Sequence, residues 1–299
     1  MTPPHKMPSP HKMPSPHEMP PPDKMPSPRE MAERDALQLG GMALRNGVLL
    51  QSESNWAAAI RRPSGEISLY SGPKKQVRGH KHLKKAPVLR GVVRLVESGA
   101  MLPRLRREAG AAVLPQEDPR LLAAMAGSVI GTMALRRRGR RGPSLLRETA
   151  VAALSLGPAL LALRSSKLSR FHGAEHKSVA AYESDGEAGT AAKEHERCGS
   201  NLVVPLMLTN LASGGVLRSL GKERRPLPVM IAGLASIGSA IELFGWMGRH
   251  KGNPVADMLR APGIELQRLF TTSEPSPDQL DVAQAALTEL LRLEGLPAA

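Results

Sequence analysis

The sequence predicts a mainly α-helical, membrane-associated bundle with a short β-hairpin region near its N-terminus and an amphipathic helix at its C-terminus. Three observations lead to this prediction. Long apolar segments occupy residues 121–247, a hairpin pattern occupies residues 56–70, and a helix start signal occurs at residues 276–278. Aromatic residues make up only 2% of the chain, so its core must be built from Ala, Leu, Val, Ile and Met.

The N-terminal segment repeats a proline-rich hexapeptide, typified by PHKMPS, through residues 3–31. Proline at this density prevents regular helices and sheet ladders, and little apolar surface is present to fold. We therefore expect residues 1–36 to be a disordered tail, whose His-Lys-Met units could bind a soft metal ion weakly but are better interpreted as solvated. We expect residues 37–299 to form the folded domain, with a basic hairpin and amphipathic region (37–120), apolar helices that carry an HGAEHK motif (121–247) and a C-terminal helical tail (248–299).

The first part of this domain is expected to contain a hairpin and an amphipathic helix. Residues 56–62 and 66–70 flank a Pro-Ser-Gly turn, which is typical of two antiparallel strands. The apolar segment 88–96 contains Arg90 and Arg94, which lie four residues apart and therefore share one face of a helix. Two placements stay open for this helix: on a membrane surface, or packed on a protein core.

The positive charge of the chain is concentrated in residues 61–107. This region contains thirteen Lys or Arg residues and two Glu, within a chain of net charge +14. Such basicity suits phosphate, whether in lipid headgroups or in nucleic acid. Because only Tyr70 in this region could stack on a base and no nucleic-acid-binding motif occurs, we disfavour nucleic acid. We expect membrane lipids as partners and leave a protein partner open.

Apolar segments in the second part of the domain favour a location at the cell membrane. These segments are Leu121–Leu135, Thr149–Leu163, Asn201–Leu217 and Leu227–Met247. A membrane-spanning helix needs roughly 20 apolar residues, so only the last segment is clearly long enough. Arginine and lysine occur in every intervening loop, and therefore the charge distribution does not define a topology. We expect a multi-pass or tightly associated membrane protein with its site on the cytoplasmic side, and a soluble helical bundle is the alternative.

The C-terminal region predicts an amphipathic helix that begins at Ser276-Pro277-Asp278. Its apolar positions lie on one face and are Leu280, Ala283, Leu287, Leu290 and Leu291. Such a face is expected to dock on the rest of the protein.

The motif with the clearest chemical meaning is H-x-x-E-H, formed by His172, Glu175 and His176. In a helix the two histidines stand one turn apart on one face, about 6 Å along the axis, which allows both imidazoles to bind one metal ion. Glu175 lies close enough to act on a metal-bound water. The pattern is that of the inverzincin type of zinc peptidase.

Two further ligands are available shortly after this motif. His195 and Cys198 are three residues apart, and together with His172 and His176 they offer the nitrogen and thiolate donors of a tetrahedral zinc site. Either Cys198 or His195 is expected to complete the shell of the two histidines. Glu183 lies seven residues after His176, about 10 Å along a continuous helix, so we place it outside the group of direct ligands.

Several stretches together resemble a known bacterial family. The sequences FHGAEHK and YE, followed by H-x-R-C-G, are similar to the YqhQ-like family of predicted metal-dependent enzymes, a domain of unknown function. Similar segments also occur at Leu39–Leu50, with its double glycine, at Pro87–Glu97 and at Leu266–Leu287. The likeness covers about residues 37–293.

This resemblance implies a multi-pass membrane protein with a metal-dependent activity. The matched polar positions are His172, Glu175, His176, Lys177, Glu183, His195, Arg197, Cys198 and, in the last apolar segment, Glu242. Met42 and Asn46 stand where the family usually has Gln and Glu. If that Glu takes part in the chemistry, this chain is expected to be altered or inactive.

We carry two hypotheses from different functional classes. In the first, the protein is a hydrolase with a divalent metal, expected to be zinc; Glu175 is its general base, and Lys177 or Arg197 stabilises an oxyanion. In the second, it is a non-enzymatic membrane scaffold or adaptor, in which the HGAEHK cluster is a structural polar network. The sequence does not decide whether the chain is an enzyme, and neither hypothesis defines a substrate.

Overall fold

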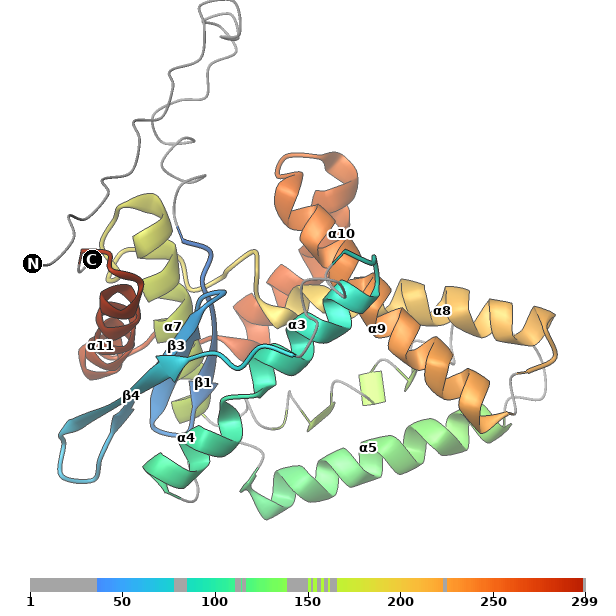
Figure 1. Ribbon diagram of the computed structural model, residues 1–299, viewed down its shortest axis with the longest axis horizontal. Helices are drawn as coiled ribbons and strands as arrows, with labels where there is room; N and C mark the ends of the chain where they lie inside the picture. Colours follow the sequence, from blue (N-terminus) through green and yellow to red (C-terminus); the bar gives the residue numbers. More distant parts are fainter. Residues whose placement is uncertain are drawn as a thin grey trace, which may run out of the picture. The chain divides into compact units, whose positions relative to one another are not determined.

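The structure is a computed structural model that describes residues 37–77, 85–110, 114, 117–138, 150–151, 153–154, 157–158, 161, 166–222 and 225–297. Residues 37–299 form one compact unit, which is described here by itself (Figure 1). The predicted tail, residues 1–36, lies outside the described residues, as does most of the apolar segment 149–163.

The N-terminal part of this unit is a four-stranded antiparallel sheet in the order β1-β2-β3-β4. Its strands are β1 (Gly40–Leu44), β2 (Gly47–Gln51), β3 (Asn55–Arg61) and β4 (Ile67–Pro73). The predicted hairpin is β3–β4 and is confirmed, but it is only half of the sheet. β1 and β2 were not predicted, because β2 is covered on both faces and so lacks the apolar–polar alternation that marks a strand.

The helical part of the unit follows in the sequence. Its elements are α3 (Leu89–Gly99), α4 (Leu102–Ala109), α5 (Pro119–Arg138), α7 (Ser166–Ser184), the 3₁₀ turn η3 (Gly199–Leu202), α8 (Val203–Ser219), α9 (Pro226–Arg249), α10 (Pro254–Leu266), the π-helical turn η4 (Gln267–Thr271) and α11 (Pro277–Glu294). The predicted mainly helical class is therefore confirmed, with the addition of the complete sheet.

Each face of the sheet builds its own core. On one face, Val48, Leu50 and Ala59 pack with α7 and α11. On the other face, Leu49 and Trp56 pack with α4. The helix α7, which contains the HGAEHK motif, contributes its own apolar face to the core that it shares with the sheet and α11, through Phe171, Ala174 and Val179.

The C-terminal helix α11 is confirmed as an amphipathic helix that docks on the protein. It begins with a capping box between Ser276 and Gln279 and ends at Gly295, which adopts a left-handed conformation (φ 72°). Its Ala283, Leu287, Leu290 and Leu291 are buried against the sheet and α7, whereas Leu280 is partly buried. The helix is therefore part of the main core.

The segment 88–96 is helical, as predicted, and α3 packs against α9. Gly91 and Gly238 allow this close approach, since a Cβ on Gly238 would lie 2.3 Å from the carbonyl oxygen of Val88. Arg90 donates hydrogen bonds to Glu242 across this contact, with its Nε 2.7 Å from Oε1. One face of α3 therefore packs on the protein, which is the second of the two placements left open by the sequence. Leu95, on the outer side of the helix, is exposed.

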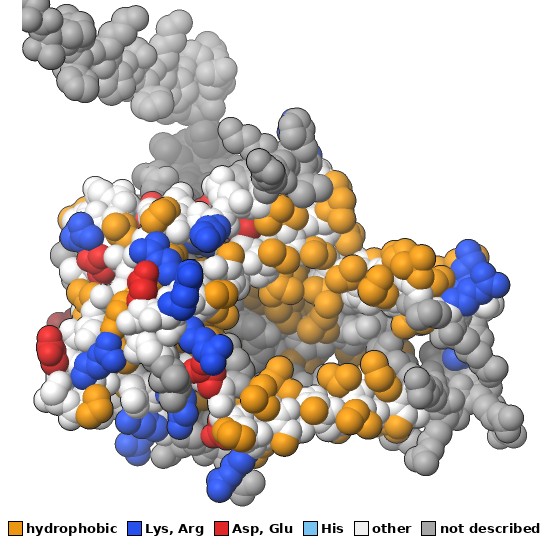
Figure 2. All heavy atoms as spheres, turned by 60° about the horizontal axis from the view of Figure 1, so that its bottom comes forward, with side chains coloured by type: hydrophobic (Ala, Val, Ile, Leu, Met, Phe, Trp, Pro, Cys, Tyr) orange, Lys and Arg blue, Asp and Glu red, His pale blue; other side chains and the backbone are white. Residues whose placement is uncertain are grey.

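Within the described residues, two helices are long and apolar enough to cross a membrane. They are Gly199–Ser219 and Leu227–Arg249, with mean hydropathies of 1.3 and 1.8. Only 11% and 17%, respectively, of the most apolar 18-residue stretch of each helix is buried inside the protein, although the two helices pack on each other. Figure 2 shows hydrophobic side chains gathered over α5 and the α8–α9 pair, whereas Lys, Arg, Asp and Glu cover the sheet side. These features are weak evidence for membrane association.

Candidate metal centre

The predicted H-x-x-E-H motif lies in the middle of α7. The rings of His172 and His176 are one helical turn apart, with centroids 4.4 Å from each other. Between them, Gly173 lets the segment after η4 approach the helix, because a Cβ there would lie 2.1 Å from the carbonyl oxygen of Ser273. Ser169 holds the same segment through its carbonyl oxygen, which accepts a hydrogen bond of 3.0 Å from the amide of Ser273. α7 is therefore fixed against this segment at the level of the histidines.

Backbone carbonyl groups orient both imidazole rings. His172 Nδ1 is 2.8 Å from the carbonyl oxygen of Thr271, and His176 Nδ1 is 2.6 Å from that of Lys193. Because a carbonyl oxygen only accepts hydrogen bonds, each Nδ1 must carry the proton, and each Nε2 then has a free lone pair. Burial lowers the pKa of His176 well below its ordinary value, which keeps this ring neutral at physiological pH. Both rings are thus prepared as metal ligands.

Cys198 completes a group of three donors. Its Sγ is 3.5 Å from His172 Nε2, and the ligand atoms of His172, His176 and Cys198 all lie within 4.8 Å of one another. Burial raises the pKa of the Cys198 thiol to about 11, so a metal ion has to displace its proton in order to bind the thiolate. Two imidazoles and one thiolate are donors that suit zinc.

His195, the other predicted ligand, lies beside this group instead of within it. Its ring centroid is 5.6 Å from that of His176, and its Nε2 is 3.2 Å from Glu183 Oε2. Burial lowers the pKa of His195, and the nearby Glu175 partly opposes this shift. Glu183 also forms an ion pair with Arg197. These contacts place Glu183 and Arg197 behind His195, where they hold the turn that leads to Cys198.

Glu175 lies next to both histidines. Its Oε2 is 3.6 Å from His176 Nε2 and 3.9 Å from His172 Nε2. Burial raises its pKa, while the coulombic effects of His172 and then His195 oppose this rise. Gly41 in β1 gives the carboxylate its space, since a Cβ there would lie 2.6 Å from Oε1. The second glycine of the Gly40–Gly41 pair therefore has a specific reason that the sequence alone did not reveal.

The segment from η4 to α11 contributes contacts that were not predicted. Gln267 is fully buried; its Oε1 accepts a hydrogen bond of 2.7 Å from the amide of His195, and its Nε2 donates to the carbonyl oxygen of His195 and to Ser200 Oγ. Thr271 supplies the carbonyl oxygen for His172. In the sequence, only the family likeness of Leu266–Leu287 pointed to these contacts. Any residue type can supply a backbone carbonyl, so the sequence does not mark the role of Thr271.

The predicted oxyanion-stabilising cations are already engaged by carboxylates. Lys177 is buried, and its Nζ donates to Glu274 Oε2 at 2.8 Å, whereas Arg197 is paired with Glu183. Glu242, which matched a family position, bonds to Arg90 between α3 and α9. The structure therefore groups His172, Glu175, His176 and Cys198 at one point, with His195, Glu183 and Arg197 adjoining them.

Comparison with known proteins supports the same family as the sequence motifs. Residues 161–293 match the model of DUF1385, described as a protein of unknown function. The chain is also 25% identical over 302 residues to the uncharacterized protein YqhQ of Bacillus subtilis (strain 168), an alignment that covers 86% of this chain and 93% of that protein. No solved structure matches the chain. The matched region contains the whole His/His/Cys group, and neither description states a metal or an activity.

Proposed function

We propose that this protein is a membrane-associated, metal-dependent hydrolase that binds one zinc ion through His172, His176 and Cys198. The observation that carries the proposal is the approach of these three donors to within 4.8 Å of one another, with both imidazoles oriented by backbone carbonyls. Ring orientation of this kind is typical of metal-ligating histidines. The donor set fits zinc better than magnesium or calcium, which prefer oxygen ligands.

Three protein ligands are typical of catalytic zinc sites, which keep a fourth position open for water or substrate. Bound zinc would act as a Lewis acid and lower the pKa of a water in that position. Glu175 is placed to accept a proton there, because its Oε2 lies within 4 Å of both Nε2 atoms. A buried carboxyl with a raised pKa is suited to accept and return a proton near neutral pH.

The oxyanion role of Lys177 and Arg197 stays a prediction. Lys177 is paired with Glu274 and Arg197 with Glu183, so one of these ion pairs has to open when substrate binds. The proposed chemistry therefore depends on Glu175 as the base more than on either cation.

The membrane part of the proposal rests on α8 and α9. Their apolar surface is mostly exposed in the isolated chain, whereas the core helix of a soluble protein would be largely buried. Cys198 directly precedes the first of these candidate spans, which begins at Gly199. The metal centre would therefore lie at the membrane boundary, on the cytoplasmic side in our proposal. Release of the full-length chain from membranes by alkaline carbonate would contradict integral insertion.

Metal analysis of the purified full-length chain tests the centre directly. We expect about one zinc per chain in the wild type and none in the double variant His172→Ala, His176→Ala. His250→Ala is the matched control, because this exposed histidine contacts Trp246 away from the donor group and its loss should leave the zinc content unchanged. Absence of metal from wild-type protein that was prepared without chelators would refute the proposal.

The alternative, a non-enzymatic scaffold, is favoured by the extent of the polar contacts around the centre. The ion pairs Lys177–Glu274 and Glu183–Arg197 tie α7 to two other segments, and Gln267 ties these two segments to each other, as a structural network would. Glu175→Gln separates the two functions. If the protein is a hydrolase, we expect the variant to keep its zinc and its stability. Its turnover of ester, phosphoester or amide substrates should fall about 10²- to 10⁴-fold. For the scaffold we expect no turnover in the wild type and a loss of stability in the variant.

A further inference from the structure

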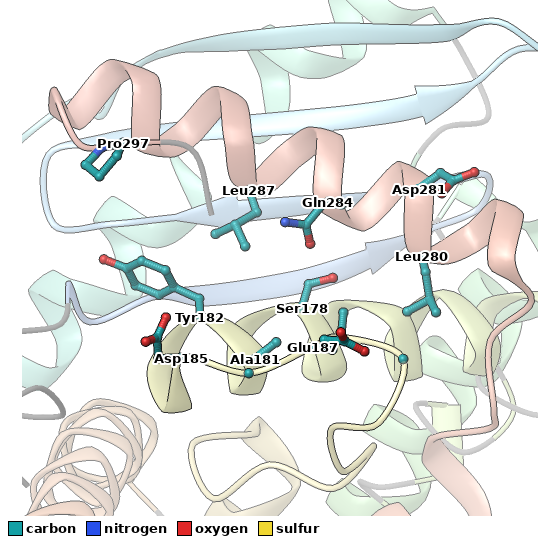
Figure 3. Close-up of a pocket in the computed structure, with 13 residues that line it drawn as sticks. Ser178, Ala181, Tyr182, Asp185, Glu187, Leu280, Asp281, Gln284, Leu287 and Pro297 are labelled. Atoms are coloured by element: carbon teal, nitrogen blue, oxygen red, sulfur yellow. The ribbon is translucent and has the colours of Figure 1, made fainter. Parts of the chain in front are cut away.

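A second candidate site lies on another side of α7. A pocket of about 530 Å³ is lined by the C-terminal half of α7, the loop that follows it, and α11. Figure 3 shows Ser178 and Tyr182 pointing from α7 towards α11, and Leu280, Gln284 and Leu287 pointing back from α11. This volume is within the usual range of small-molecule sites.

The charged groups around this pocket are all acidic. Asp185, Glu187 and Asp281 line it, and no Lys, Arg or His is among the described residues of its wall. Within the part of the chain that the structure describes, none of the three carboxylates forms an ion pair. Their negative potential favours a cationic ligand.

Ser178 gives an independent indication that something binds here. Its side chain is fully buried, and its Oγ has no hydrogen-bond partner among the described residues. A buried polar group without a partner is costly, and most such groups in proteins are satisfied. Because Ser178 lines the pocket and points towards α11, a ligand in the pocket is the natural source of the missing hydrogen bond.

We propose that this pocket binds a small organic ammonium ion. Carboxylates at the rim would pair with the ammonium group, and Ser178 Oγ would accept a hydrogen bond from it. An alkyl chain would lie against Tyr182, Leu280 and Leu287, which a bare metal ion could not use. The ring of Tyr182 adds a surface that attracts cations.

The pocket is separate from the metal centre. Along a helix each residue turns by about 100°, so Ser178 lies roughly 200° around α7 from His176 and about 240° from His172. The ammonium proposal therefore does not depend on the presence of zinc. Failure of either proposal leaves the other intact.

Isothermal titration of the full-length chain with 1,5-diaminopentane and with spermidine, at about 0.15 M salt to screen unspecific attraction, tests this proposal. We expect saturable binding of at least one probe with a dissociation constant below about 1 mM. The double variant Glu187→Gln, Asp281→Asn should weaken binding about fivefold to tenfold, since it removes two partly exposed ion pairs. Glu66→Gln, which removes one exposed charge from the β3–β4 turn, should change binding less than about twofold.

Ser178→Ala distinguishes a binding role from a packing defect. Removal of an unpaired buried hydroxyl should leave the melting temperature of the free protein unchanged or higher, while affinity for the ammonium probe falls about threefold to tenfold. The proposal is overturned by unchanged affinity in this variant, by equal losses in Glu66→Gln and the double variant, or by no saturable binding to the wild type. Displacement of the probes by millimolar calcium, bound in their place, would also overturn it.

Discussion

Replacement of Gly173 by alanine tests how the candidate metal centre is held together. A methyl group at this position would lie 2.1 Å from the carbonyl oxygen of Ser273 and 3.2 Å from its carbon. These are backbone atoms, which cannot rotate away as a side chain can. α7 and the segment after η4 must therefore move apart. Two hydrogen bonds cross this contact: Ser273 N to Ser169 O at 3.0 Å, and His172 Nδ1 to Thr271 O at 2.8 Å.

The size of the effect follows from three contributions. Alanine would stabilise an ordinary helix interior by about 1 kcal/mol relative to glycine. Overpacking against a fixed backbone costs about 1–3 kcal/mol, and each of the two hydrogen bonds contributes about 1 kcal/mol. We therefore expect Gly173→Ala to lower the free energy of unfolding by about 2–4 kcal/mol. Loss of the carbonyl partner of His172 should also weaken zinc binding about 10- to 100-fold.

A matched control is available in α5. Gly127 has open space where its Cβ would be, so Gly127→Ala should raise the free energy of unfolding by about 0.5–1 kcal/mol. Both variants can be measured by denaturant unfolding, followed through the buried Trp56, and by competition for zinc with a chelator. Wild-type stability together with wild-type zinc affinity in Gly173→Ala would refute the proposed packing of α7.

Four other substitutions test three single contacts around the sheet, α7 and α11. Gly41→Ala should lower stability by about 1–2 kcal/mol in thermal melts, because its methyl group would lie 2.6 Å from Glu175 Oε1; unchanged melting would contradict this. Glu274→Ala should be more destabilising than Lys177→Met in the same melts, because only the first leaves a buried ammonium group without its carboxylate; the reverse order would be inconsistent with the pair. Hydrogen bonds from Arg292 and, to a smaller extent, from Ser71 in β4 keep the pKa of Glu289 below its usual range. The stabilisation from these hydrogen bonds is therefore present above about pH 4.3 and is lost as the pH falls. Glu289→Gln should cost about 0.5–1 kcal/mol at pH 7 and nothing near pH 2, and a pH-independent difference would contradict it.

Patterns with a clear period or start signal predicted the fold well. The amphipathic face and capping residues of α11 were both visible in the sequence, and the turn between β3 and β4 was marked by proline and glycine. The first two strands were not predicted, since each is only five residues long and neither alternates between buried and exposed positions. The packing of α7 on the sheet, α11 and η4 depends on contacts between residues more than 90 positions apart, and sequence periodicity contains no such information.

The candidate site was predicted in its residues but not in its arrangement. Spacing along one helix identified His172 and His176, and the distance along that helix led us to place Glu183 outside the direct ligands; in the structure Glu183 contacts His195 and Arg197. Whether Cys198 or His195 joins the pair depends on how the turn before η3 folds, which spacing alone left open. The structure brings Cys198 to His172 and turns His195 towards Glu183.

The geometry of β1 also shows where the departures at Met42 and Asn46 lie. Successive residues of a strand point to opposite faces, and Gly41 faces Glu175, so Met42 points to the far side of the sheet, where it packs with the Trp56 cluster. Asn46 lies in the turn after β1, and its carbonyl oxygen accepts a hydrogen bond from the amide of Arg61 at the end of β3. The departure at Met42 therefore lies on the face of the sheet opposite Glu175, and the departure at Asn46 lies in the turn that joins β1 to β2.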